Sequence, residues 1–119
     1  MVRAVRGAVQ VEADEKPLVA AGITKMITQI VDDNLIKVHD IVSIFFTVTG
    51  DIKSVNPAAA LRTEDGWADT PLFCAQEPNT EGAMPRVVRV LVTCNNFKAD
   101  QKVKHAYLGG AVSLRPDLK

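Results

Sequence analysis

Apolar and polar residues alternate most clearly over residues 85–93, a stretch rich in valine. This pattern predicts a β-strand, whose successive side chains point to opposite faces of a sheet. The even-numbered valines share one face, and Arg89 shares the other face with Leu91. A guanidinium among apolar neighbours must meet an anion, because an unpaired charge is costly to remove from water. The anion is either a carboxylate of the protein or a ligand.

The same periodicities predict the remaining elements. Apolar residues spaced three and four apart indicate an amphipathic helix that begins near Pro17. Asn56 and Pro57 are suited to begin a second helix, and Gly66 is placed to end it. The expected elements in chain order are a strand over 2–11, a helix over 17–34, a connector over 37–40, a strand over 41–49, the second helix, strands over 71–77 and 85–93, a helical turn over 101–104, a strand over 107–112 and an extended tail over 114–119.

This order predicts an α+β fold, in which a mixed sheet carries both helices on one face. At 119 residues the chain is expected to form a single domain over residues 1–119. Two helices cannot cover both faces of a five-stranded sheet this apolar. We therefore expect chains to associate through the open face of the sheet.

Composition narrows the classes of function. The 14 basic and 14 acidic residues cancel, which argues against nucleic acid or an anionic membrane as a partner. Cys74 and Cys94 lack metal-ligand spacing, and no apolar run approaches the length of a membrane helix. The alternating residues at the start of the sequence lead us to expect no secretory leader. A reduced, cytoplasmic setting is the expectation.

Several arginines lie beside small or apolar residues instead of in polar connectors. Arginine stays charged when buried and pairs bidentately with carboxylates, so such a set favours a site for a small polyanion. The alternative is that each arginine pairs with an acidic residue such as Glu64, Glu77 or Asp117, and spacing alone supports both interpretations equally. The arginines concerned are Arg6, Arg62, Arg89 and Arg115.

No cofactor, metal or nucleophile motif accompanies these arginines. His39 and His105 lack metal-ligand spacing and are interpreted as surface or packing residues. Cys74 has no evident histidine base, which favours a packed thiol over a nucleophile. Tyr107 can donate to a carboxylate, although a core role is the better interpretation. The residues alone predict an anion site without a cofactor, and they define no reaction.

Six motifs, in their order and spacing, resemble the monofunctional AroH-class chorismate mutases over essentially the whole chain. The resemblance implies a homotrimer whose sheets form a pseudo α/β barrel, with active sites at the subunit interfaces. It implies the Claisen rearrangement of chorismate to prephenate in phenylalanine and tyrosine biosynthesis, without cofactor, metal or covalent intermediate. The motifs are VRGA at 5–8, PA at 57–58 followed by Arg62, CAQE at 74–77, RVVRVL at 86–91, HAYL at 105–108 and LRPDL at 114–118.

Carried over to this chain, the resemblance assigns a role to each matched position. Arg89 would contact the ether oxygen that gains charge as the C–O bond breaks, and Arg6 and Tyr107 of the same subunit would hold a substrate carboxylate. Cys74 and Glu77 would reach the ring hydroxyl from across the interface. The residues implied to line or close the site are Arg62, Leu72, Phe73, Leu114 and Arg115.

Two positions depart from the family pattern, which commonly has an aromatic residue in place of Asn56 and a lysine in place of Ala59. We expect unchanged chemistry with weaker substrate capture, and therefore a raised KM. Two alternatives stand beside the mutase: an imine deaminase of the Rid type, which has a similar trimeric sheet arrangement, and a catalytically weak regulatory trimer.

Overall fold

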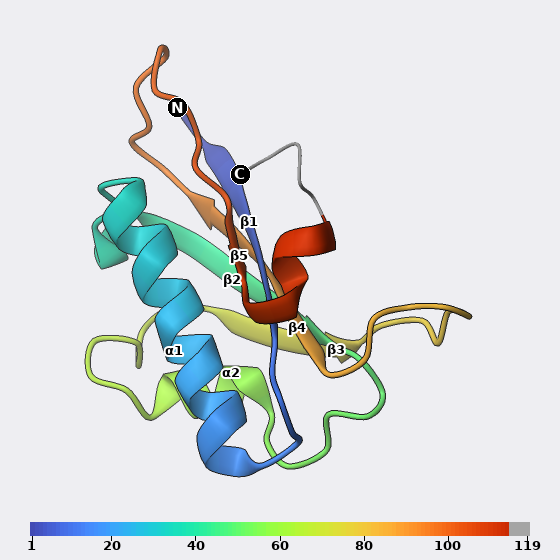
Figure 1. Ribbon diagram of the computed structural model, residues 1–119. Coiled ribbons are helices and arrows are strands. Elements are labelled where there is room, and N and C mark those ends of the chain that lie inside the picture. The colour runs from blue at the N-terminus through green and yellow to red at the C-terminus, as the bar shows by residue number, and fades with distance from the viewer. Residues whose placement is uncertain (115–119) are drawn as a thin grey trace.

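The computed structural model describes residues 1–114 and has the α+β order expected from the sequence (Figure 1). Short 3-10 helices, η1 (Val38–Asp40) and η2 (Gly109–Leu114), precede β2 and follow β5. The strands and α-helices are β1 (Arg3–Gln10), α1 (Lys16–Asp33), β2 (Ile41–Val48), α2 (Pro57–Arg62), β3 (Leu72–Gln76), β4 (Val87–Cys94) and β5 (Ala106–Leu108).

The five strands form one mixed sheet in the order β3-β2-β4-β1-β5. The central strand β4 is antiparallel to both β1 and β2. The outer pairs, β2 with β3 and β1 with β5, are parallel. The strand that carries Arg89 is therefore flanked on both sides, and its side chains have neighbours from two strands.

Both α-helices lie on the same face of the sheet, as predicted (Figure 1). The even-numbered valines of β4 face them and are buried with Ile23, Met26 and Ile30 of α1. Gly7 of β1 lets α1 approach closely, because a Cβ at that position would lie 3.0 Å from Ile30 Cδ1. Burial of this apolar face is the main stabilising term of the fold.

The opposite face of the sheet is only partly covered. Here η2 packs Ala111 against Ala8 of β1 and Val87 of β4. Farther along the strands, Phe45 and Phe73 lie with ring centroids 5.9 Å apart and are both exposed. Exposed apolar side chains of this size are typical of a surface that binds a partner.

Two expected elements after β4 differ from the structure. The helical turn expected at 101–104 is absent, because the side chain of Asn34 binds the backbone of Lys104 on both its N–H and its C=O. The strand expected over 107–112 ends at Leu108. Gly109 then adopts a φ of +58° and the chain turns into η2, against the backbone of Gln10.

Two smaller boundaries also shift. Helix α2 ends at Arg62, so Gly66, with a φ of +91°, lies in the turn beyond the helix and does not end it. The N-cap prediction is confirmed, since the Asn56 side chain accepts hydrogen bonds from the N–H groups of Ala58 and Ala59. Leu114 ends η2, and the rest of the expected tail lies outside the described residues.

Candidate active site

Arg89 lies at the centre of the open face, where its Nε pairs with Oε1 of Glu77 at 2.8 Å. Of the two kinds of anion that the sequence left open for Arg89, the structure thus supplies a carboxylate of the chain. Glu77 follows β3, and its N–H donates to the carbonyl of Val48 in the neighbouring strand at 2.8 Å. This contact extends the parallel pairing past the end of β3 and brings the carboxylate over β4. Strand register, which spacing along the chain does not reveal, creates the pair.

A second contact orients the same carboxylate. The hydroxyl of Thr47 donates to Oε1 of Glu77 at 2.7 Å, and Thr47 is the β2 residue directly opposite Arg89. The Glu77 side chain is largely buried, whereas that of Arg89 is 42% exposed. Because the pair engages Nε, the two terminal nitrogens of the guanidinium can still donate to an anion.

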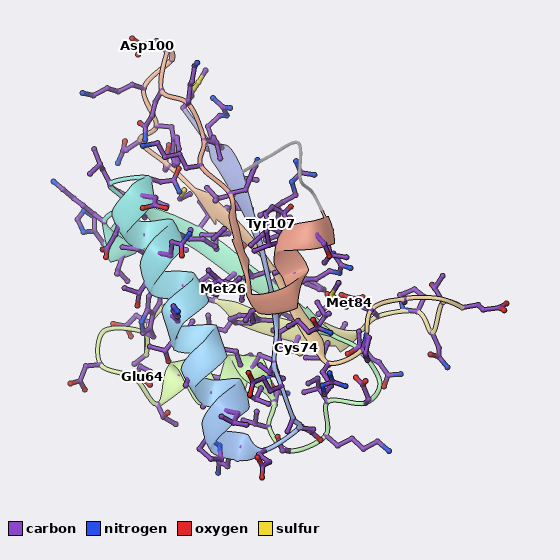
Figure 2. The ribbon with its side chains drawn as sticks, in the orientation of Figure 1. Met26, Glu64, Cys74, Met84, Asp100 and Tyr107 are labelled. Carbon is purple, nitrogen blue, oxygen red and sulfur yellow. The ribbon has the colours of Figure 1, made fainter. Side chains whose placement is uncertain are left out.

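Arg6 and Tyr107 lie on the same face as Arg89. Ala8 of β1 is opposite Arg89 on one side and Tyr107 of β5 on the other, so these three residues form one row across the sheet. Arg6 lies two residues from Ala8 along β1 and is exposed. Tyr107 packs beside η2 (Figure 2). The structure thus places Arg6, Glu77, Arg89 and Tyr107 on one face of a single chain.

Cys74 belongs to a different part of the molecule. It alternates with Phe73 along β3 and packs toward the main core, beside a cavity of about 310 Å³ that Asn56 and Gln76 also line. Burial raises the pKa of the Cys74 thiol, which keeps it protonated at neutral pH. Within one chain, Cys74 and Glu77 therefore project to opposite sides of the sheet, and their shared role at the ring hydroxyl stays a prediction.

The other expected site residues are divided between these two regions. Leu72 is buried toward the core like Cys74, and Arg62 ends α2 on that same side of the sheet. Phe73 lies on the open face, and Leu114, the last residue of η2, packs against the same small cluster as Tyr107. Arg115 lies outside the described residues. Those of the expected site residues that the structure describes therefore form two groups on opposite sides of the sheet.

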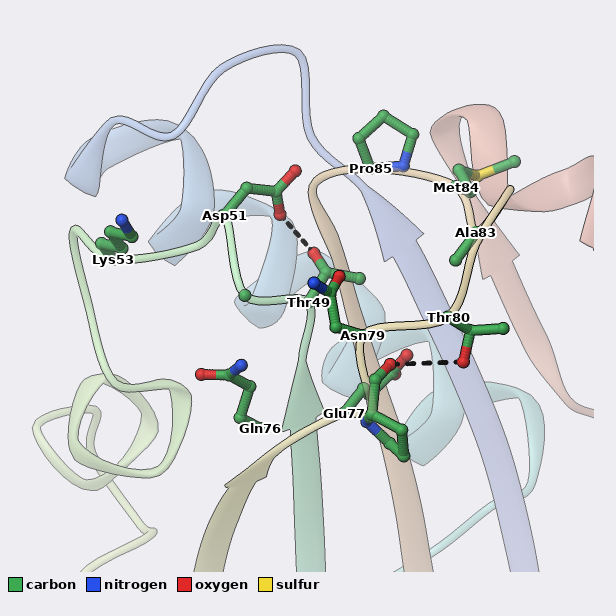
Figure 3. A pocket seen from close by; sticks show the side chains of 12 residues that line it. Thr49, Asp51, Lys53, Gln76, Glu77, Asn79, Thr80, Ala83, Met84 and Pro85 are labelled. Carbon is green, nitrogen blue, oxygen red and sulfur yellow. Dashed lines mark hydrogen bonds between the residues drawn. The ribbon is translucent and has the colours of Figure 1, made fainter.

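A cavity of about 450 Å³ includes Glu77 in its wall and is lined by residues 49–51, 53, 76–80 and 83–85 (Figure 3). Asp51 lies in this lining, and its carboxylate accepts hydrogen bonds from the Thr49 hydroxyl at 2.5 Å and from the Arg86 N–H. The latter contact supports the φ of +53° at Arg86, which precedes β4. Sequence reasoning missed Thr47 and Asp51, because ordinary polar residues in strands and turns carry no motif.

The described residues hold no group of three histidine, cysteine, aspartate or glutamate side chains arranged for a metal ion. Nor does the described part of the chain contain a helix with the length and apolarity required to cross a membrane. The fold defines a small α+β protein whose open sheet face carries the side chains of Arg6 and Arg89.

Comparisons with known proteins identify the family. The family described as chorismate mutase type I matches residues 2–118. Chorismate mutase AroH of Bacillus subtilis (strain 168) is 33% identical over 118 residues, covering 99% of this chain and 93% of the relative. Chorismate mutase AroH of Thermus thermophilus is 38% identical over 120 residues, covering 100% of this chain and 98% of the relative.

A solved structure agrees with these relatives. A chorismate mutase from Clostridium thermocellum superposes with a TM-score of 0.87 at 34% identity, covering 93% of this chain and 98% of the other. The chain belongs to the chorismate mutase type I family. Its enzyme class is chorismate mutase, an isomerase of aromatic amino acid biosynthesis. Between the mutase and the imine deaminase, the comparisons therefore support the mutase.

Proposed function

We propose that the chain converts chorismate to prephenate at the open-face site, with Arg89 as the catalytic donor. The observation that carries this proposal is the guanidinium of Arg89, which Glu77 holds through Nε on a face of the sheet that Arg6 and Tyr107 share. Chorismate carries two carboxylates, which suits a cationic site in a chain of zero net charge.

The reaction requires no general base, because the C–O bond breaks as the C–C bond forms within one molecule. It requires a reactive conformer held in place and a fixed donor at the ether oxygen, where negative charge develops. Arg6 and Tyr107 hold a carboxylate of the substrate. Glu77 and Thr47 fix the plane of the Arg89 guanidinium, so that little reorganisation is needed as charge develops.

We further propose that the complete site forms between subunits of a homotrimer, each subunit a single domain over residues 1–119. Cys74, Arg62 and the cavity beside Asn56 lie on the side of the sheet away from Arg89. A neighbouring chain can bring this region onto the open face and cover Phe45 and Phe73 in the same contact. In this arrangement Arg115 and Leu114 close the site.

The test is loss of chorismate absorbance with formation of prephenate, followed for the purified protein and for Arg89→Ala. We expect turnover by the wild type and a fall of at least a hundredfold in kcat for the variant. Arg3→Ala is the matched control, since Arg3 lies on the same face of β1 as Val5 and Gly7 and opposite to Arg6. An inactive wild type would support the regulatory alternative instead, and full activity of Arg89→Ala would refute the assignment of Arg89.

A further inference from the structure

The side chain of His105 contacts the backbone of Arg6. The N–H of Arg6 donates to His105 Nδ1 at 2.9 Å, although the two residues are 99 positions apart in the sequence. The parallel pairing of β1 with β5 begins one step later, at Gly7 and Ala106. The imidazole therefore extends the pairing of β1 by one residue, at the point where Arg6 projects into the proposed site.

The segment that carries His105 is itself held in place by Asn34, a buried residue directly after α1. Its side chain accepts from the N–H of Lys104 at 2.8 Å and donates to the carbonyl of Lys104 at 2.9 Å. It also donates to the carbonyl of Ile30, within α1, at 2.8 Å. Because Lys104 directly precedes His105, these contacts determine where the imidazole enters the sheet.

We propose that His105 is a positioning residue, which holds the backbone of Arg6 so that its guanidinium is aimed at the substrate carboxylate. This inference rests on the proposed role of Arg6. Accepting at Nδ1 requires the neutral imidazole with its proton on Nε2. Without an acceptor, the Arg6 N–H loses its partner at the end of the β1–β5 pairing, and Arg6 becomes less well preorganised.

Two substitutions of matched shape test this role. In His105→Asn, the amide oxygen can occupy the position of Nδ1 and still accept, whereas His105→Leu has nearly the same shape without an acceptor. We expect His105→Leu to raise KM about five- to tenfold, the equivalent of one lost hydrogen bond. The effect falls on KM more than on kcat, because a carboxylate contact is made in the ground state and the transition state alike. His105→Asn should stay within about twofold of the wild type.

A spectroscopic readout separates positioning from general destabilisation. In ¹H–¹⁵N spectra, the Arg6 amide proton should be strongly deshielded in the wild type and in His105→Asn, and should move upfield in His105→Leu. Both variants lose the rest of the imidazole, so an effect that depends on the ring and not on the acceptor would appear in both equally. If His105→Leu does not fold, His105→Ala replaces it as the variant without an acceptor.

The Arg6→Met background distinguishes failure of this inference from failure of the proposed function. If His105 acts through Arg6, adding His105→Leu to Arg6→Met should raise KM no further. If Arg6→Met alone leaves KM unchanged, the proposed role of Arg6 is wrong and the inference falls with it. If Arg6→Met raises KM while His105→Leu behaves like the wild type or like His105→Asn, the positioning role alone is wrong.

Discussion

At the scale of single residues, the contact between Arg89 and Glu77 decides how the site is built. A guanidinium can bind a protein carboxylate through Nε and a ligand through its terminal nitrogens at the same time. The two interpretations of the arginines that the sequence left open are therefore compatible. Arg89 has a carboxylate partner in the chain and retains donors for a substrate.

The geometry of this pair predicts that Arg89→Lys is nearly as damaging as Arg89→Ala. Lysine has a single nitrogen on a flexible stem and cannot engage Glu77 while presenting further donors in a fixed plane. Loss of one preorganised donor typically costs about 3–4 kcal/mol of the barrier, on the order of 10²–10³ in kcat. Steady-state kinetics of both variants provide the measurement, and near-wild-type turnover by Arg89→Lys would contradict the assignment.

Thr47 offers a milder test of the same arrangement. Thr47→Val removes the hydroxyl that donates to Glu77 and keeps the shape of the side chain. We expect kcat to fall about three- to tenfold, the effect of roughly 1 kcal/mol. Thr47→Ser retains the hydroxyl and serves as the control. Equal kcat values for the two variants would show that Thr47 does not orient the carboxylate.

The buried thiol of Cys94 is expected to make the free energy of unfolding depend on pH. Burial and the nearby Asp40 carboxylate raise the pKa of its thiol to about 11, from a value near 9 in the unfolded chain. The folded state thus holds this proton more tightly, so its contribution to stability is complete below pH 9 and is lost as the pH rises toward 11. Between pH 8 and pH 10.5, the urea concentration at the midpoint of unfolding should fall more for the wild type than for Cys94→Ala. An equal fall in both proteins would exclude Cys94 as the cause.

At the scale of elements, Asn56 at the start of α2 has two roles: it stabilises the helix, and it lies in the proposed site. The residue caps the helix and also lines the cavity beside Cys74, where the family commonly has an aromatic side chain. A short helix depends strongly on its cap, because few of its backbone groups are bonded internally. Substitution at this position therefore affects both helix stability and the site.

Restoring the family pattern with Asn56→Phe and Ala59→Lys should lower KM and also lower the free energy of unfolding by about 1 kcal/mol through loss of the cap. Asn56→Ala is the matched control, with the same loss of stability and no gain in substrate capture. Kinetics and urea unfolding on all three proteins separate the two effects. An unchanged KM in the double variant would count against the expected role of these positions.

At the scale of the whole molecule, the two groups of site residues lie on opposite sides of one sheet. A single chain therefore cannot close the site around a substrate, and the exposed Phe45 and Phe73 remain in water. The proposed trimer resolves both problems in the same contact. This separation makes the origin of each residue testable by mixing subunits.

Mixed trimers of Arg89→Ala and Arg62→Ala chains should regain activity, because some interfaces combine an intact Arg89 face with an intact Arg62 region. Mixtures of Arg89→Ala and Glu77→Ala are the control and should regain none, since both residues belong to the same face of one chain. Co-refolding followed by activity and mass measurements provides the test. Recovery in the control mixture would place Glu77 across the interface from Arg89.

The sequence by itself determined the four longer strands, the long helix, the Asn56 cap and the face on which Arg89 lies, since these depend on local periodicity and capping. Family motifs also identified most of the candidate site residues. Only the tertiary structure decided which residues meet. Register brought Glu77 and Thr47 to Arg89, and the Asn34 contact with Lys104 replaced an expected helical turn. Such pairings join residues distant in the chain, and no local pattern records them.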